Sequence, residues 1–197
     1  MKYYRLLVTL LKQIREDWQA HGRDWTLPGF RAVAVYRIGN WVRDRQKGLI
    51  QSMLFALYLI MYRFIRNHYG IELRETTRVG RRFVVGHQSG IVIHPNSEFG
   101  DDCLIRQNVT IGAVNMARIN DGPKLGHRVD VGAGAVILGR VKIGDDVQIG
   151  PNAVVMTDIP AGATVFVEAP RMIQVKKTKE NGRPSGGGQQ GGGTQAR

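Results

Sequence analysis

Cysteine, acidic side chains and long apolar runs are all scarce in this chain of 197 residues. The single cysteine, Cys103, excludes an intramolecular disulfide framework and a zinc site built from cysteines alone. No run reaches the ~18 apolar residues that a membrane-spanning helix needs, and the N-terminus lacks the apolar core of a signal peptide. These absences favour a cytoplasmic protein with one main hydrophobic core.

The shortage of acidic residues is uneven along the chain. There are 28 Lys and Arg residues against 16 Asp and Glu, a formal net charge of +12. Residues 1–70 carry +8, residues 71–170 carry −1 and residues 171–197 carry +5. A nucleic-acid-binding domain is expected to be basic throughout its binding face and to carry a known nucleic-acid-binding motif. The neutral middle and the missing motif argue against nucleic acid as a partner.

Aliphatic residues recur at every sixth position through the middle of the chain. Eight of nine positions in one series are Leu, Ile or Val: Leu125, Val131, Ile137, Ile143, Ile149, Val155, Ala161, Val167 and Ile173. Two earlier series run from Leu73 to Ile91 and from Ile93 to Ile111, with a two-residue slip between them. The position four residues after each of these anchors is usually small or β-branched, which an ordinary β-sandwich would not require.

A period of six fits neither an α-helix nor a simple amphipathic strand. It is typical of a β-helix in which three hexads form one triangular coil of about 18 residues. The 100 residues from Leu73 to Ile173 then predict five to six coils. The protein is thus expected to be mainly β, with a parallel β-helix as its larger part.

The N-terminal region has the period of helices instead. Apolar stripes predict helices over residues 3–20, 30–45 and 49–68. We expect an α-helical domain at residues 1–70, a β-helix at 71–175 and a basic, Gly-rich disordered tail at 176–197. Part of the tail is also consistent with a linker added to the chain.

One of the five histidines lies where the hexads slip. His87 stands at the end of one series of anchors and just before the next, in a predicted turn. A histidine displayed at a coil corner is a candidate general base, and an ordinary surface histidine is the alternative. Cys103 falls on a small inward position and is interpreted as core. Three histidines converging on a metal are not expected, because His87, His94 and His127 belong to different coils.

Several segments resemble the serine acetyltransferase family of hexapeptide-repeat acyltransferases. The similar segments are the His87-x-x-Gly90 context, the run from Gln107 to Gly112, and the run from Leu125 to Gly139. The resemblance covers about residues 71–167, and residues 28–41 show a weaker similarity to the same family. It implies a left-handed β-helix, acetyl-CoA as co-substrate, no metal, and a homotrimer with active sites between subunits.

The resemblance also implies roles for residues of this chain. His87 matches the family's general base, and Glu72 matches the aspartate that orients it. His87 would accept the proton of an acceptor hydroxyl as that oxygen attacks the thioester, and Glu72 would hold the other ring N–H. A backbone N–H near Gly112 could stabilise the oxyanion. The pantetheine would lie against Gly112, Ala113, Ala133 and Pro151, and Arg171 would contact the phosphates.

The substrate loop departs from the family. The stretch Asn120-Asp121-Gly122-Pro123-Lys124 stands where the family has Asp-Arg-His-Pro-Lys, and Gly86 stands where it has an aspartate. The cation and the anion that would hold a zwitterionic amino acid are therefore lost. We expect Asn120, Asp121 and Lys124 to face another acceptor, such as a sugar hydroxyl of a surface-polysaccharide precursor.

Two alternatives in function remain open at this stage. One is a true serine O-acetyltransferase with an atypical acceptor pocket. The other is a non-catalytic hexapeptide scaffold at a membrane surface. The basic helical region, with its apolar stretch from Met53 to Tyr62, suits either peripheral contact with an anionic membrane or packing inside an oligomer.

Overall fold

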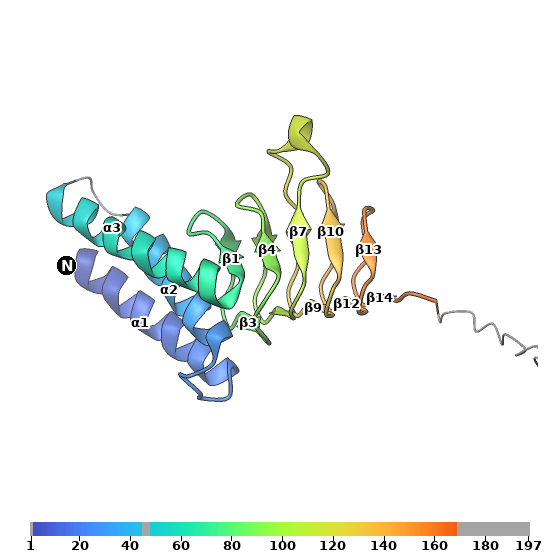
Figure 1. The fold of residues 1–197 in the computed structure, drawn as a ribbon. Helices are drawn as coiled ribbons and strands as arrows, with labels where there is room; N and C mark the ends of the chain where they lie inside the picture. The colour runs from blue at the N-terminus through green and yellow to red at the C-terminus, as the bar shows by residue number, and fades with distance from the viewer. Residues whose placement is uncertain (1, 45–47, 169–197) are drawn as a thin grey trace, which may run out of the picture. The chain divides into compact units, whose positions relative to one another are not determined.

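The computed structural model describes residues 2–44 and 48–168, and the side chains from residue 6 onward. Residues 1–167 form one compact unit, and residues 168–197 are a second unit of which only Glu168 is described. Arg171 and the tail at residues 176–197 therefore lie outside the described residues. Figure 1 shows the helices α1, α2 and α3 at the N-terminal end of a stack of β coils.

Within the described residues, fourteen short strands wind into a left-handed β-helix of about five coils, confirming the predicted fold. All strand pairs are parallel, and the strands form three sheets. Sheet A contains β1 (Ile71–Leu73), β4 (Ile91–Ile93), β7 (Thr110–Gly112), β10 (Val136–Leu138) and β13 (Val154–Val155). Sheet B contains β2 (Arg78–Val79), β5 (Glu98–Phe99), β8 (Lys124–Leu125) and β11 (Lys142–Ile143). Sheet C contains β3 (Val84–Val85), β6 (Leu104–Ile105), β9 (Asp130–Val131), β12 (Gln148–Ile149) and β14 (Thr164–Val165).

The hexad anchors form the core of the coils. Anchors from Leu73 to Val155 point inward, and nearly all of them are buried. Cys103 is buried too, as predicted, and burial raises the pKa of its thiol to about 11. Partner residues in the regular coils are 18 apart, as in the pair Val136 and Val154. One aliphatic side chain per face is therefore enough to fill the narrow interior.

The last part of the anchor series was predicted wrongly. Ala161 and Val167 are exposed, whereas Ile159 and Val165 pack against the core. The register explains the difference, since Ile149 pairs with Val165 and Ile143 with Ile159, only 16 residues apart. The final coil is two residues shorter than the others, and the inward positions shift accordingly.

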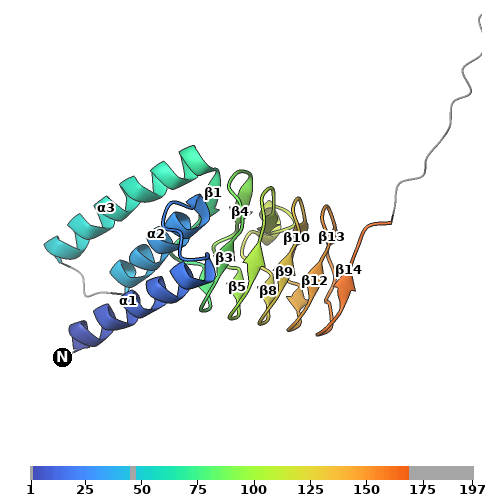
Figure 2. The same ribbon diagram turned by 90° about the horizontal axis from the view of Figure 1, so that it is seen from below.

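The three helices lie close to their predicted positions. They are α1 (Lys2–Ala20), α2 (Pro28–Arg43) and α3 (Leu49–Phe64), and α2 packs against both of the others (Figure 2). Helix α3 continues through a π-helical turn, η1 (Ile65–Tyr69), and ends at Gly70, which has a left-handed φ of 62°. The continuous helix Leu49–Tyr69 is long and apolar enough to cross a membrane by length and composition, which the count of uninterrupted apolar residues missed.

Buried polar contacts join the helices to the first coil. Arg37 of α2 forms a buried ion pair with Asp17 of α1 at 2.8 Å and donates to the carbonyl of Val79 at 2.9 Å. Tyr36 donates to the carbonyl of Thr77, and Tyr58 of α3 donates to Glu75 at 2.6 Å. Unpaired, these groups would cost free energy on burial, so their pairing sets the position of the helices on the β-helix.

Candidate active site in two halves

Two corners of the β-helix carry the residues singled out in the sequence. The histidine corner consists of the turns from sheet C to sheet A, at residues 86–90, 106–109, 132–135 and 150–153. The loop corner consists of the turns from sheet A to sheet B, at residues 74–77, 94–97, 113–123 and 139–141. Sheet A separates the two corners, so each carries only part of the expected site.

His87 lies in a turn that is longer than its counterparts in the later coils. Val85 pairs with Ile105 and Ile93 pairs with Ile111, so the turn that carries His87 contains the two-residue slip seen in the sequence. The turn then passes through Ser89 and Gly90, with φ of 82° and 69°. A side chain at Gly90 would meet the Asn108 amide oxygen at 2.3 Å. Both the left-handed backbone and the lack of room for a Cβ atom therefore favour glycine at position 90.

The neighbouring coils hold this turn in place. Ser89 donates its N–H to the carbonyl of Tyr69 at 2.8 Å and accepts from the N–H of Asn108 at 2.9 Å. The imidazole of His87 is exposed. The backbone of the turn that carries His87 is therefore hydrogen-bonded both to the residue before the first coil and to the next coil, while the His87 ring is exposed.

Glu72 lies on the outer face of sheet A. It is the middle residue of β1, pairs in register with Val92 of β4 and is half-buried. Burial raises the pKa of Tyr62, and the negative charge of Glu72 raises it further, so this carboxylate lies close to α3. Among the described residues no hydrogen bond joins Glu72 to His87, and the orienting role of Glu72 stays a prediction.

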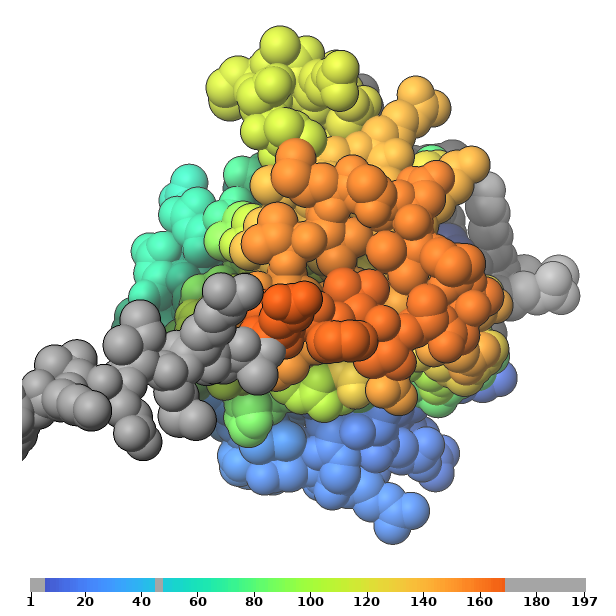
Figure 3. All heavy atoms as spheres, turned by 90° about the vertical axis from the view of Figure 1, so that its right-hand side faces the viewer, coloured from blue at the N-terminus to red at the C-terminus, as the bar shows by residue number. Residues whose placement is uncertain are grey.

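The loop between β7 and β8 projects from the loop corner (Figure 3). Its tip is a short 3₁₀ helix, η2 (Met116–Arg118), capped by the Asn115 side chain, which accepts from the Arg118 N–H at 3.1 Å. The Asn96 amide donates to the carbonyl of Asn120 at 3.1 Å and fastens the end of the loop. A side chain at Gly122 would meet the Asn96 carbonyl oxygen at 2.3 Å. The loop in this position therefore requires glycine at 122.

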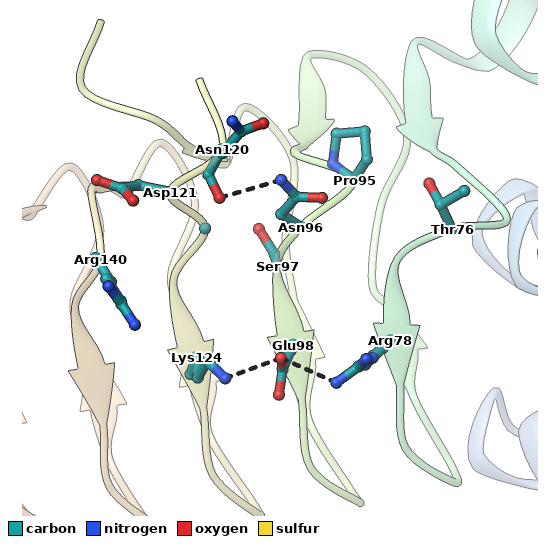
Figure 4. Close-up of a pocket in the computed structure, with 11 residues that line it drawn as sticks. Thr76, Arg78, Pro95, Asn96, Ser97, Glu98, Asn120, Asp121, Lys124 and Arg140 are labelled. Atoms are coloured by element: carbon teal, nitrogen blue, oxygen red, sulfur yellow. Dashed lines mark hydrogen bonds and ion pairs between the residues drawn. The ribbon is translucent and has the colours of Figure 1, made fainter. Parts of the chain in front are cut away.

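A polar pocket of about 520 Å³ lies beside the loop on sheet B. Asn120, Asp121 and Lys124, the predicted substrate residues, line this pocket together (Figure 4). Glu98 binds Lys124 at 2.9 Å and Arg78 at 3.3 Å across adjacent strands. Sheet A lies between this pocket and the turn of His87.

Sequence reasoning missed three charged residues of this pocket: Arg78, Glu98 and Arg140. A signal for two of them was present. The residue just before the anchor is charged in each strand of sheet B, namely Arg78, Glu98, Lys124 and Lys142. Because neighbouring side chains in a strand point to opposite faces, this pattern predicts a charged outer face for sheet B. Arg140 follows no such pattern, since it lies in a turn.

The predicted coenzyme A residues divide between the two corners. Ala133 and Pro151 lie in successive turns of the histidine corner and line a second pocket of about 350 Å³. Gly112 ends β7 and Ala113 begins the loop, so both belong to the loop corner. A single chain does not bring these four residues together.

The other histidines of the β-helix lie at other corners. His94 begins the turn after β4 in the loop corner, and His127 lies in the turn from sheet B to sheet C. Within residues 2–44 and 48–168, no group of three His, Cys, Asp or Glu residues is arranged to hold a metal ion.

Comparison with known proteins places this architecture in a class. A family model described as bacterial transferase hexapeptide (six repeats) matches residues 117–158. The serine acetyltransferase of Helicobacter pylori is 37% identical over 163 residues, which are 81% of this chain and 91% of that protein. The putative colanic acid biosynthesis acetyltransferase WcaB of Escherichia coli is 34% identical over 166 residues, 82% of this chain and 99% of that protein.

A solved structure extends the comparison to the fold. Serine acetyltransferase isoform 3 from Entamoeba histolytica, in complex with cysteine, aligns with a TM-score of 0.73 at 25% identity. The alignment covers 88% of this chain and 64% of the other, so this chain spans less than two thirds of that structure. The protein is a hexapeptide-repeat acyltransferase with a left-handed β-helix. Within that class the chain belongs to the serine acetyltransferase family and is an acetyl-CoA-dependent O-acetyltransferase.

Proposed function

We propose that the protein transfers acetyl groups from acetyl-CoA directly to an acceptor hydroxyl, with His87 as general base. A ring nitrogen of His87 takes the hydroxyl proton while the oxygen bonds to the thioester carbonyl carbon. The tetrahedral intermediate then expels the thiolate, which takes the proton back from the imidazolium, so the products are the acetyl ester and the coenzyme A thiol. Glu72 positions the imidazole and stabilises its cationic form. The exposed ring of His87, on a turn whose backbone is hydrogen-bonded to its neighbours, supports this role.

The complete site forms between two subunits in this proposal. The outer face of sheet A is largely apolar, with Val92 and Val154 exposed and Val136 half-buried. The outer face of sheet B is charged, so sheet A is the face suited to burial. If sheet A faces a three-fold axis, the histidine corner of one subunit lies beside the loop corner of the next. A homotrimer then unites the two groups of predicted coenzyme A residues.

The acceptor in our proposal is a sugar hydroxyl of a surface-polysaccharide precursor. The observation that carries this choice is the contact at Gly122, which has no room for the histidine that the family resemblance implies there. Asp121 adds an anion where that resemblance implies an arginine, so an amino-acid carboxylate would be repelled. An uncharged hydroxyl compound meets neither obstacle, and the likeness to WcaB is compatible with it.

Serine O-acetylation is the second candidate. It is favoured by the names of the matched relatives, since the Helicobacter pylori protein and the solved structures are serine acetyltransferases. The two candidates share the same base and donor and differ only in the acceptor pocket. The cytoplasm, where acetyl-CoA is available, is the proposed location for either.

An acceptor screen with acetyl-CoA tests the proposal through release of the free thiol. We expect turnover with glycan acceptors and little with L-serine. His87→Ala should lose at least about 100-fold in turnover while remaining folded, because general-base assistance contributes about 10²–10⁴ in rate. His127→Ala is the matched control, an exposed histidine at another corner, and should keep near-normal turnover.

Each part of the proposal has its own contrary result. Near-normal turnover of His87→Ala would remove the general base from that residue. Robust turnover of L-serine together with no glycan turnover would replace the sugar acceptor with the second candidate.

A further inference from the structure

The outward face of helix α3 carries a row of large apolar side chains. Six large apolar side chains of α3 are exposed: Leu49, Ile50, Met53, Leu57, Ile60 and Phe64. At 100° per residue they fall within an arc of about 100°, so they form one continuous stripe. We call these six residues the α3 stripe. Scattered exposed apolar residues are ordinary, but a continuous stripe of this kind marks a contact surface.

The most deeply buried side chains of α3 are two tyrosines. Tyr58 and Tyr62 are the buried residues of the helix, and the Tyr58 hydroxyl is held by Glu75. A helix at the surface of a protein normally turns its apolar side inward and its polar side to water. In α3 six large apolar side chains point outward as well, so that side of the helix is not suited to contact with water.

An apolar groove opens beside the α3 stripe. It measures about 580 Å³ and lies between α2 and α3, and Ile60 and Phe64 belong to both the groove and the stripe. Trp25 stands at its rim with its ring largely exposed. Tryptophan is favoured where hydrocarbon meets polar headgroups. Stripe, groove and rim together form one apolar surface with an aromatic edge.

The charged side chains of α3 and of the segment just before it are all of one sign. Residues 45–69 contain no Asp or Glu, and Arg63 and Arg66 are exposed on the helix. A second copy of this surface would bring like charges together, which is unfavourable. An anionic surface would instead be attracted to it, at about 1 kcal/mol for each nearby cation. Charge therefore favours contact with an anionic lipid surface over contact with a second copy of the protein.

We propose that the α3 stripe lies in the interface of a lipid bilayer that contains anionic lipids. The helix rests on the bilayer and does not cross it, because its tyrosine face remains packed on α2 and on Glu75. The adjoining groove is open to a hydrocarbon chain of a lipid. This surface binds membrane independently of which hydroxyl compound is acetylated.

Flotation of the full-length protein with vesicles tests the proposal. We expect the protein to float with phosphatidylcholine vesicles that contain phosphatidylglycerol, less so at high salt, and poorly with phosphatidylcholine alone. Leu57→Asp should lower the partition coefficient at least tenfold. Leu11→Asp is the matched control, since Leu11 is 58% exposed on α1 and Leu57 is 53% exposed. It should float as the wild type does.

Two further measurements complete the test. The double variant Arg63→Gln/Arg66→Gln should bind anionic vesicles about fivefold less tightly for each charge removed. All variants should keep the acetyl-CoA turnover of the wild type, which shows that they remain folded.

Three results would overturn the proposal. The first is equal flotation of Leu57→Asp and the wild type. The second is an absence of flotation combined with a smaller oligomer for Leu57→Asp, which would mean that a second copy covers the stripe. The third is resistance of the bound protein to alkaline carbonate extraction, which would mean a spanning helix.

Discussion

At the scale of single residues, two histidines show how burial separates a structural role from a chemical one. His21 is buried between α1 and β3, with Nδ1 2.7 Å from the Asp17 carbonyl oxygen and Nε2 accepting the Val85 N–H at 3.2 Å. Both ring nitrogens are used, so the neutral ring with its proton on Nδ1 fits this site. His87 instead has its ring exposed to solvent. A similar imidazole thus fastens the helices at one position and is proposed to catalyse at the other.

His21 is expected to make the stability depend on pH. Burial lowers the pKa of His21 in the folded protein below its ordinary value near 6.5. Between the two values the unfolded chain binds more protons, so the stabilising contribution is complete above pH 6.5 and is lost as the pH falls through the lowered pKa. Denaturant unfolding at pH 7.5, 6.5 and 5.5 measures this fall. His21→Gln should flatten it, and an unchanged slope in that variant would contradict the role.

At the scale of elements, the start of α2 decides how closely the helices approach the first coil. A side chain at Gly29 would meet the Val85 carbonyl oxygen at 1.9 Å, and this obstacle is backbone of β3. The same strand donates the Val85 N–H to His21. The free edge of this one short strand is therefore covered both by the start of α2 and by His21, just after the end of α1.

Gly29→Ala is expected to push α2 away from β3. Overpacking of a well-fitted contact costs about 1–3 kcal/mol, and the free energy of unfolding should fall by that amount. Gly48→Ala is the matched control, because a side chain at Gly48 meets nothing within 4 Å and its φ of 175° is extended. Chemical denaturation of the two variants compares them, and equal stabilities would show that the contact yields without cost.

At the scale of the whole molecule, the split of the predicted site argues for an assembly. His87, Ala133 and Pro151 lie at one corner, while Gly112, Ala113 and the substrate loop lie at the other. The apolar outer face of sheet A lies between them. Burial of that face against two other copies would complete three sites at once.

Mixing of two variants tests the shared site. His87→Ala and a variant with residues 114–119 replaced by glycine and serine should each be inactive alone. Random mixed trimers should recover about a quarter of the wild-type turnover, because each site takes its histidine from one subunit and its loop from the next. The control is a mixture of the separately purified variants under conditions that prevent subunit exchange. No recovery in randomly mixed trimers would place both halves of the site in one chain.

The register of the coils was the most predictable feature of this protein. Anchors such as Ile137 and Ile149 are buried because a triangular coil has one inward position per face, and a period of six records this directly. The prediction failed at Ala161 and Val167 because the final coil is two residues shorter. Small and aliphatic residues alternate there, so the sequence pattern does not reveal the shortening. Arg140 was not predicted as a pocket residue either, because the pocket is built from turns of several coils that only winding brings together.

The sequence by itself determined the β-helix, the three helices and the position of His87 at a slip in the repeat, because each is a matter of local spacing. It also revealed the loss of the family's cation and histidine near Asp121. Only the tertiary structure decided that Gly122 must be glycine, that Glu72 and the polar pocket lie on different faces, and that six large apolar side chains of α3 point outward. These three features depend on which parts of the backbone and which helix faces, distant in the sequence, come into contact. A local sequence pattern carries no information about such contacts.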